Sequence, residues 1–337
     1  MDQQLLGELQ LALSGSKKIV IIPHKNPDGD ALGSSLALNY FLNKTGHYSI
    51  VIAPNEYPEF LDWMPNQEKV IKFSKATGKS TQCILEADII FTLDFNQLNR
   101  IDEMAAYVDQ SNAKIIMIDH HEHPGDYASI TYSDSNKGST CEMIFEVIDR
   151  LDIKQIDAEI ATCLYTGIMT DTGSFRFQST TARTHEIISV LIQKGAKPNN
   201  IHQKIYDTYS LNRLQLLGTA LNNLKKINEL PVVYITISQK ELNKNKFKKG
   251  DTEGFVNYGL SLLEISLSVI MIENDTEKVI KMSFRSKGTF DVNQFAKTYF
   301  NGGGHKNAAG GISKLSLDET VANFLNAVNK EKYLFDE

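Results

Sequence analysis

Between residue 18 and about residue 170, short runs of β-branched and aliphatic residues alternate with longer segments of helical pattern. The runs IVII, YSIVIA, ADIIFTLD and AKIIMID have the length and composition of buried strands. A helix from about Ala31 to Asn43 is expected between the first two runs. This alternation is typical of a parallel sheet with helices on both faces, so an α/β domain is predicted here.

The remainder of the chain changes pattern twice. Helical segments dominate from about residue 157 to residue 228, and strand signals then return in PVVYITIS, ISLSVIMIE and KVIKMSFRS. We therefore expect an N-terminal parallel-sheet domain over residues 1–190, a helical linker over 191–228, and a smaller α/β domain over 229–337.

The charge of the chain restricts the partners it can bind. A formal net charge of −6 over 337 residues argues against a protein that binds long nucleic acid through its phosphates.

The three cysteines lack metal-finger spacing, which indicates small buried hydrophobic residues in a reducing cytosol. The apolar runs are too short to span a bilayer, so we expect a cytoplasmic protein with no membrane attachment.

The stretch HKNPDGDALG, directly after the first predicted strand, places three metal-ligand side chains within seven positions. Asp28 and Asp30 flank Gly29, which permits an unusual backbone turn, so both carboxylates and His24 can face one point. This mixture of oxygen and nitrogen ligands suits Mn²⁺ or Mg²⁺ better than Zn²⁺ or Co²⁺. Taken alone, NPDGD is also typical of a solvated turn.

Further candidate ligands follow two other predicted strands. They are Asp94 after IIFTL, and Asp119, His120 and His121 after IIMI. A strand-end histidine is often only hydrogen-bonded to a neighbour, but the carboxyl ends of parallel strands form one edge where ligands collect. Two divalent cations sharing a carboxylate at that edge would favour hydrolysis of a phosphate ester.

Two more segments allow a structural and a functional interpretation. Asp171, in GIMTDTGSF, is either part of a helix cap or a further carboxylate for the second cation. In KGSTCEMIF, Ser139 or Thr140 would cap a helix, and the same helix start could donate backbone N–H groups to a phosphate.

A glycine-rich segment near the C-terminus is a candidate anion site. In NGGGHKNAAGG, residues 301–311, consecutive glycines let backbone N–H groups converge on a bound anion, and His305 and Lys306 add further hydrogen-bond donors. The alternative is a glycine turn packed closely on a helix. Arg285, at the end of a predicted strand, could hold a second phosphate through two hydrogen bonds.

Taken together, these motifs resemble the DHH phosphoesterase superfamily, in the subfamily with a C-terminal DHHA1 domain, and the stand-alone bacterial nanoRNases most of all. The resemblance extends from about residue 17 to residue 327 and rests on HKNPDGDALGSSLAL, TLDFNQ, IDHHEHPG, GIMTDTGSF and FRSKGTFDVNQFAKTYFNGGGHKNAAG. Asn301 departs from the four glycines common in the family, and EHPGDYA lacks basic residues that some relatives carry.

The resemblance implies a role for each matching residue. The first cation would be held by His24 and Asp28, and the second by Asp30, His120 and Asp171, with Asp94 bridging them. Asp119 would support the site, and His121 would contact the scissile phosphate or assist the leaving group. The nucleotide would be held by Arg285, Ser286, Gly303, Gly304 and His305.

The expected activity is a Mn²⁺-dependent phosphohydrolase, with Mg²⁺ or Co²⁺ as other cations, whose active site lies between the two domains. The resemblance implies short oligoribonucleotides, linear dinucleotides or 3′-phosphoadenosine 5′-phosphate as substrates, and it suggests a homodimer. Alternative functions are a cyclic-dinucleotide phosphodiesterase, a pyrophosphatase or exopolyphosphatase, and a catalytically inactive nucleotide-binding regulator.

Overall fold

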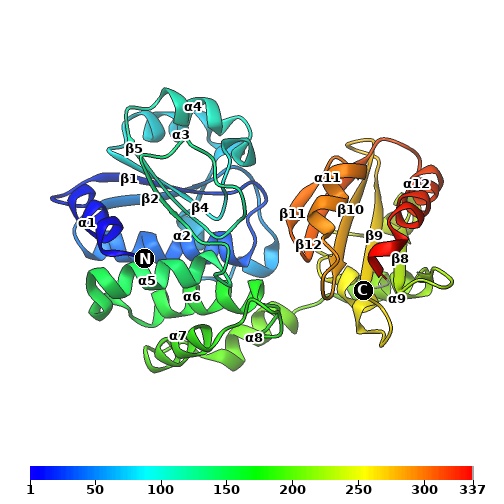
Figure 1. Ribbon diagram of the computed structural model, residues 1–337. Helices are drawn as coiled ribbons and strands as arrows, with labels where there is room; N and C mark the ends of the chain where they lie inside the picture. The colour runs from blue at the N-terminus through cyan, green and yellow to red at the C-terminus, as the bar shows by residue number, and fades with distance from the viewer. Residues whose placement is uncertain (336–337) are drawn as a thin grey trace. The chain divides into compact units, whose positions relative to one another are not determined.

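The computed structural model describes residues 1–335. The chain forms two compact units, Met1–Thr208 and the residues from Tyr209 onward. Figure 1 shows the strands and helices of each unit. Within residues 1–335, every helix is too short or too polar to cross a membrane.

The N-terminal unit is built on a six-stranded sheet in which all neighbouring strands are parallel. Its strands are β1 (Lys18–Pro23), β2 (Tyr48–Ala53), β3 (Ile71–Lys72), β4 (Ile89–Leu93), β5 (Lys114–Asp119) and β6 (Ile130–Ser133). Their order is β3-β2-β1-β4-β5-β6, so the chain leaves β1 toward one edge and returns on its other side at β4. The predicted parallel sheet is confirmed, and the β1–β4 boundary is the switch point where such sheets bind ligands.

Helices cover both faces of this sheet, as predicted (Figure 1). On one face lie α2 (Gly29–Lys44), α5 (Thr140–Asp152) and α6 (Ala158–Asp171), and on the other lie α3 (Thr77–Leu85) and α4 (Met104–Gln110). Successive residues of β1 point to opposite faces of the sheet. Ile19 and Ile21 belong to the apolar core shared with α2, α5 and α6, whereas Val20 and Ile22 belong to the core shared with α3 and α4. The unit also contains α1 (Gln3–Ala12), α7 (Ala182–Gln193) and α8 (Pro198–Tyr206).

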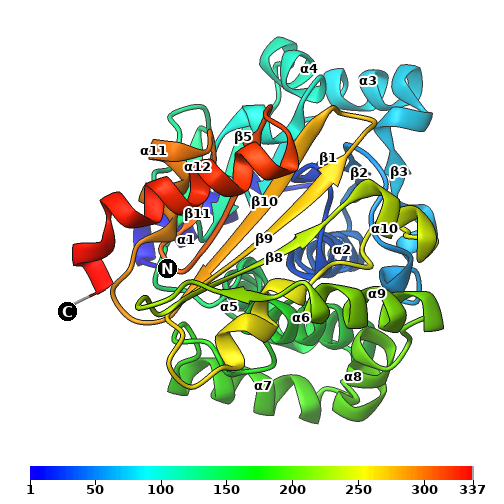
Figure 2. The same ribbon diagram turned by 90° about the vertical axis from the view of Figure 1, so that its right-hand side faces the viewer.

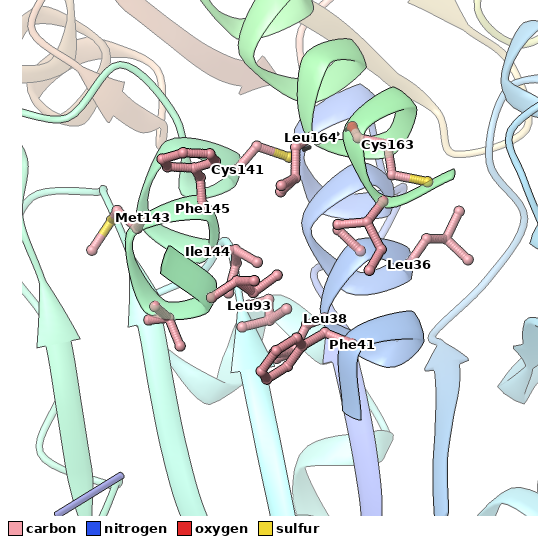
Figure 3. Packing of buried hydrophobic residues seen from close by; sticks show 14 of the residues in the cluster. Leu36, Leu38, Phe41, Leu93, Cys141, Met143, Ile144, Phe145, Cys163 and Leu164 are labelled. Carbon is pink, nitrogen blue, oxygen red and sulfur yellow. Dashed lines mark hydrogen bonds between the residues drawn. The ribbon is translucent and has the colours of Figure 1, made fainter. Parts of the chain in front are cut away.

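Small residues let α2, α5 and α6 approach one another closely. A Cβ atom on Gly33 of α2 would lie 2.6 Å from the Cys163 carbonyl of α6, and one on Gly167 would lie 2.2 Å from Cys141 Sγ of α5. Figure 3 shows the large apolar side chains of these helices packed around this contact and against β4. Cys141 and Cys163 are buried free thiols, as expected, while Cys83 is half-buried.

The second unit has a mixed six-stranded sheet of order β11-β12-β10-β9-β8-β7, in which β8 and β9 are parallel and the other pairs antiparallel. The strands are β7 (Lys225–Lys226), β8 (Val232–Ile237), β9 (Leu267–Asn274), β10 (Val279–Ser286), β11 (Gly303–His305) and β12 (Ala308–Ser313). One face packs against α11 (Val292–Tyr299) and α12 (Leu317–Lys330), and the other against α9 (Leu211–Asn222) and α10 (Gln239–Lys244) (Figure 2).

The segment expected as a helical linker contains helices that belong to different units. The helix α8 packs against α6 in the first unit, whereas α9 packs against β8 in the second. Pro198 begins α8, and Gly195, with φ of +109°, follows the end of α7.

Candidate metal centre

The candidate ligands predicted from the sequence lie at the carboxyl ends of three neighbouring strands. His24 follows β1, Asp94 follows β4, and Asp119 is the last residue of β5, directly before the two histidines. Because β1 and β4 are the strands at the switch point, His24 and Asp94 are brought side by side there.

His24 and Asp28 form the first group of ligands, together with Asp94. The Oδ1 atom of Asp28 caps α2 by accepting hydrogen bonds from the N–H groups of Asp30 (3.0 Å) and Ala31 (3.1 Å). Its Oδ2 atom lies 3.8 Å from His24 Nε2. The other ring nitrogen of His24 donates to the Lys25 carbonyl at 2.8 Å, so Nε2 is directed at the carboxylates. These three side chains can hold one cation.

Asp30, His120 and Asp171 form a second group. The His120 Nε2 atom lies 3.9 Å from Asp30 Oδ2 and 3.3 Å from Asp171 Oδ2. Asp171 is the last residue of α6, so its position depends on how that helix packs on α2. This group also places ligand atoms close enough together for one cation.

Asp94 joins the two groups. Its Oδ2 atom is 3.4 Å from His24 Nε2, and its Oδ1 atom is 3.4 Å from His120 Nε2. The residue has φ of +66°, and its N–H donates to the Ile118 carbonyl at 3.1 Å, which ties it to β5. A positive φ is uncommon for residues other than glycine, and such conformations concentrate at functional sites.

The start of α5 holds two of these carboxylates. The N–H groups of Thr140 and Cys141 donate to Asp30 at 2.6 and 2.8 Å, and the Thr140 hydroxyl donates to Asp94 Oδ1 at 2.9 Å. Ser139 is the N-cap and accepts from the Glu142 N–H at 3.1 Å. The backbone N–H groups at the start of α5 therefore bind aspartates of the protein, and the substrate-binding role of Ser139 and Thr140 stays a prediction.

Asp119 and His121 form a separate pair beside the two groups. Asp119 is fully buried and accepts from His121 twice, at 2.7 Å from the ring Nδ1 and at 3.1 Å from the backbone N–H. With Nδ1 donating to Asp119, Nε2 is the ring nitrogen that would exchange a proton with a substrate.

Close packing of buried carboxylates and histidines shifts the pKa values of several side chains at this site. Burial opposes ionisation of His24, but hydrogen bonds and charge from Asp28 and Asp94 outweigh it and raise the pKa of His24 to about 10. Burial raises the pKa of Asp171 to about 6, against the opposing effect of His120. Burial, with the charges of Asp94 and Asp171, also raises the pKa of Asp30 well above its usual range. The raised pKa values mean that the cation-free site binds protons more strongly than isolated side chains would, because its carboxylates lie close together. The same oxygen and nitrogen ligands fit divalent cations.

The candidate nucleotide-binding residues all lie in the second unit. Arg285 and Ser286 end β10, and the Ser286 hydroxyl donates to the Phe290 carbonyl at 2.7 Å. Arg285 donates through one guanidinium nitrogen to the Phe284 carbonyl at 2.9 Å. These contacts hold the end of β10 in place, and nucleotide binding by Arg285 and Ser286 stays a prediction.

Gly303, Gly304 and His305 form β11, which pairs with β12 in a hairpin. The Gly304 N–H donates to Asn293 Oδ1 of α11 at 3.0 Å, and a Cβ on Gly304 would lie 2.4 Å from the Ala308 carbonyl. The close packing of a glycine turn on a helix, one of the two interpretations of this segment, is therefore present. Its binding of an anion stays a prediction.

Sequence reasoning missed two supports of the histidine segment. Asn96 donates to the carbonyls of Glu122 and His123, and the Lys137 carbonyl accepts from His120 Nδ1 at 3.2 Å. The motif TLDFNQ contains Asn96 and was a usable signal for the first contact. The second contact spans 17 residues and involves only a backbone atom of Lys137, so the residue type carried no signal for it.

Comparison with known proteins places these features in a family. Residues 18–168 match the N-terminal domain of the DHH family, and residues 229–332 match the DHHA1 domain. The bifunctional oligoribonuclease and PAP phosphatase NrnA of Thermus thermophilus is 29% identical, with 97% of this chain and 94% of the relative aligned. The NrnA of Bacillus subtilis is also 29% identical, over 93% of this chain and 94% of the relative.

The fold of one solved structure matches that of this chain over its whole length. An exopolyphosphatase-related protein from Bacteroides fragilis is 42% identical and superposes with a TM-score of 0.96, covering 100% of this chain and 98% of the other.

Proposed function

Because the chain belongs to the DHH family and carries a DHHA1 domain, we propose that it is a phosphohydrolase that uses two divalent cations. Its proposed substrates are short oligoribonucleotides and 3′-phosphoadenosine 5′-phosphate, as the names of the NrnA relatives indicate for those proteins. The observation that carries the proposal is the position of Asp94, whose two oxygens each lie 3.4 Å from a different histidine.

The residues of the first unit would hold the cations in two groups that share one carboxylate. The first cation would be held by His24, Asp28 and Asp94, and the second by Asp30, Asp94, His120 and Asp171. Bound there, the cations would stabilise charge on the phosphate oxygens and lower the pKa of a water molecule. Mn²⁺ is the proposed ion because the ligands are mostly carboxylates with some imidazole and lack cysteine, with Mg²⁺ and Co²⁺ as alternatives.

Hydrolysis adds water oxygen to phosphorus and breaks the bond to the leaving oxygen, which must take up a proton. We assign the donation of that proton to His121 Nε2, since the Nδ1 atom of the ring already donates to Asp119. Buried Asp119 would hold the ring in one orientation, with Nε2 available for the transfer. Arg285, Ser286 and the β11 residues would hold the nucleotide portion of the substrate.

A panel of substrates tests this proposal. Purified protein is assayed with Mn²⁺, Mg²⁺ or Co²⁺ on a linear dinucleotide, a five-nucleotide RNA, 3′-phosphoadenosine 5′-phosphate, a cyclic dinucleotide, pyrophosphate and a polyphosphate. Turnover of the RNA substrates and of 3′-phosphoadenosine 5′-phosphate, highest with Mn²⁺, is expected. Nucleotide binding without hydrolysis of any substrate would contradict the proposal and favour an inactive regulator.

Polyphosphate hydrolysis is a second candidate, favoured by the 42% identity to an exopolyphosphatase-related protein. Polyphosphate has no base or ribose, so Arg285→Ala should impair hydrolysis of the nucleotide substrates more than hydrolysis of polyphosphate. Lys281→Ala, on the same strand and paired with Glu277, is the matched control. Equal activity of Arg285→Ala and wild type on dinucleotides would remove the proposed role of Arg285.

Two other expectations stay predictions. A homodimer is tested by light scattering on the full chain, and a cytoplasmic location by cell fractionation. The three free cysteines are consistent with a reducing compartment.

A further inference from the structure

We propose that Lys137 is a positioning residue that orients His120, and that Glu146 and Glu142 hold Lys137 in place for this purpose. The inference rests on the proposed function, because it assumes that His120 Nε2 binds the second cation. It assigns a role to a partly buried charged cluster that lies outside the cation ligands.

Lys137 and His120 are linked by a hydrogen bond from the histidine ring to a backbone carbonyl. The Lys137 carbonyl accepts from His120 Nδ1 at 3.2 Å, while His120 Nε2 faces Asp94 at 3.4 Å and Asp171 at 3.3 Å. A neutral imidazole that carries its proton on Nδ1 presents the lone pair of Nε2 to a cation. The carbonyl therefore selects both the tautomer and the direction of the ring.

The loop that carries this carbonyl is tied to the histidine segment at a second point. The Asp134 N–H donates to the Asp119 carbonyl at 3.2 Å, and the Lys137 N–H donates to the Asp134 carbonyl at 3.1 Å. The loop also lies close to Thr172, the residue after Asp171, because a Cβ placed on Gly138 would lie 3.2 Å from Thr172 Cγ2. A shift of residues 134–138 would therefore disturb the surroundings of two ligands.

The side chain of Lys137 turns inward and anchors the loop to α5. Its Nζ lies 2.6 Å from Glu146 Oε1 and 3.8 Å from Glu142 Oε1. The side chains of Lys137, Glu146 and Glu142 are only 18%, 14% and 2% exposed. Tyr132 donates to Glu146 at 2.5 Å and Thr184 donates to Glu142 at 3.1 Å, so both carboxylates are held from a second side.

This arrangement predicts a specific defect. Removing one member of a partly buried ion pair leaves an uncompensated charge, so the loop is expected to move or loosen in Lys137→Met. Loss of a partner that orients a ligand histidine weakens cation affinity by about 10 to 100-fold. Only the His120 group should be affected, because His24 is oriented by the Lys25 carbonyl instead.

Binding of Mn²⁺ to the full chain, followed by the electron paramagnetic resonance signal of the free ion, tests the inference without using turnover. Wild type is expected to bind two ions, and Lys137→Met to bind one as tightly as wild type and the other about 10 to 100-fold more weakly. Lys137→Arg should restore most of the lost affinity because it keeps the charge. In an activity assay, Lys137→Met should need more Mn²⁺ for half-maximal rate, while kcat at saturating Mn²⁺ recovers toward wild type.

Lys44→Met is the matched control, because Lys44 also pairs with a carboxylate, that of Asp157, and is the last residue of α2, at the opposite end of the helix from Asp28 and Asp30. Glu146→Gln provides a second test if Lys137→Met does not fold. Folded Lys137→Met or Glu146→Gln with both Mn²⁺ affinities equal to wild type would overturn the inference. Wild type that binds two Mn²⁺ ions but hydrolyses none of the substrates would overturn the proposed function and leave the positioning role supported or refuted by binding alone.

Discussion

Asp119 Oδ1 lies 2.7 Å from Nδ1 of His121, two residues further along the chain, and Asp119 Oδ2 accepts the backbone N–H of the same histidine at 3.1 Å. Both oxygens of a fully buried carboxylate are thus occupied by one residue. Such a contact fixes the ring in one orientation and leaves Nε2 as the ring nitrogen that can exchange a proton with a substrate.

Asp119→Asn should therefore lower kcat by about 10² to 10⁴-fold on a dinucleotide, because an amide holds the proton-donating ring less firmly than a carboxylate that accepts two hydrogen bonds from His121. The number of bound Mn²⁺ ions should stay at two. A p-nitrophenyl phosphodiester, whose leaving oxygen needs little protonation, should be affected much less. An equal loss on both substrates would show that Asp119 does not act through proton donation.

Asp94→Asn is expected to lower activity by about three orders of magnitude or more, since both cation groups lose a shared charged ligand. The substitution keeps the shape of the side chain and its hydrogen bond from Thr140. Asp88→Asn is a matched control, because Asp88 precedes the same strand at its opposite end and is exposed. Near-normal turnover by Asp94→Asn, or binding of two Mn²⁺ ions with unchanged affinity, would contradict the two-cation assignment.

Gly167→Ala should destabilise the protein by about 1 to 3 kcal/mol and impair cation binding. The new methyl group would lie 2.2 Å from Cys141 Sγ and 2.8 Å from Asp30 Oδ1, in a contact that has no room for it. Adding Cys141→Ala should recover part of the stability by removing the sulfur. Gly7→Ala, in a helix with open space around the glycine, should instead stabilise by about 0.5 to 1 kcal/mol. Thermal unfolding of wild type, Gly167→Ala, Gly167→Ala with Cys141→Ala, and Gly7→Ala measures these differences in stability. An unchanged Tm for Gly167→Ala would disprove the close contact.

The cation-free protein should become less stable as the pH rises from about 4 to about 10. The pKa of Asp171 is raised from 3.8 to about 6, so its stabilising contribution is complete below pH 3.8 and is lost as the pH passes 6. The pKa of His24 is raised from 6.5 to about 10, so its contribution is complete below pH 6.5 and is lost as the pH passes 10. Asp28 and Asp94 have lowered pKa values, so they act in the opposite direction only below pH 3.8.

Thermal unfolding in a chelator at several pH values tests this expectation. Saturating Mg²⁺ should raise Tm more at pH 9 than at pH 5, because the cation competes with protons for the same ligands. Asp171→Asn should flatten the pH dependence between pH 4 and 6. Stability of the cation-free protein that increases steadily from pH 6 to 9 would contradict the assigned shifts.

Local pattern was sufficient to locate the ends of most strands and the ligands that follow them. The run YSIVIA coincides with β2, and the helix expected from Ala31 to Asn43 is α2, which begins two residues earlier at Gly29. The alternation of strands and helices indicated a parallel sheet, and that arrangement alone places His24 and Asp94 at one edge. The short strands β3 and β6 and the helix α10 were not predicted, because each is brief and depends on its neighbours.

Long-range packing decided the rest of the site. Asp171 reaches the His120 group only because small residues let α6 approach α2, and no spacing in the chain encodes that distance. The roles of Thr140 and Lys137 likewise depend on where α5 begins relative to Asp30 and His120. Strand ends and ligand types are properties of neighbouring residues, whereas the convergence of ligands from different helices depends on contacts between residues more than 100 positions apart.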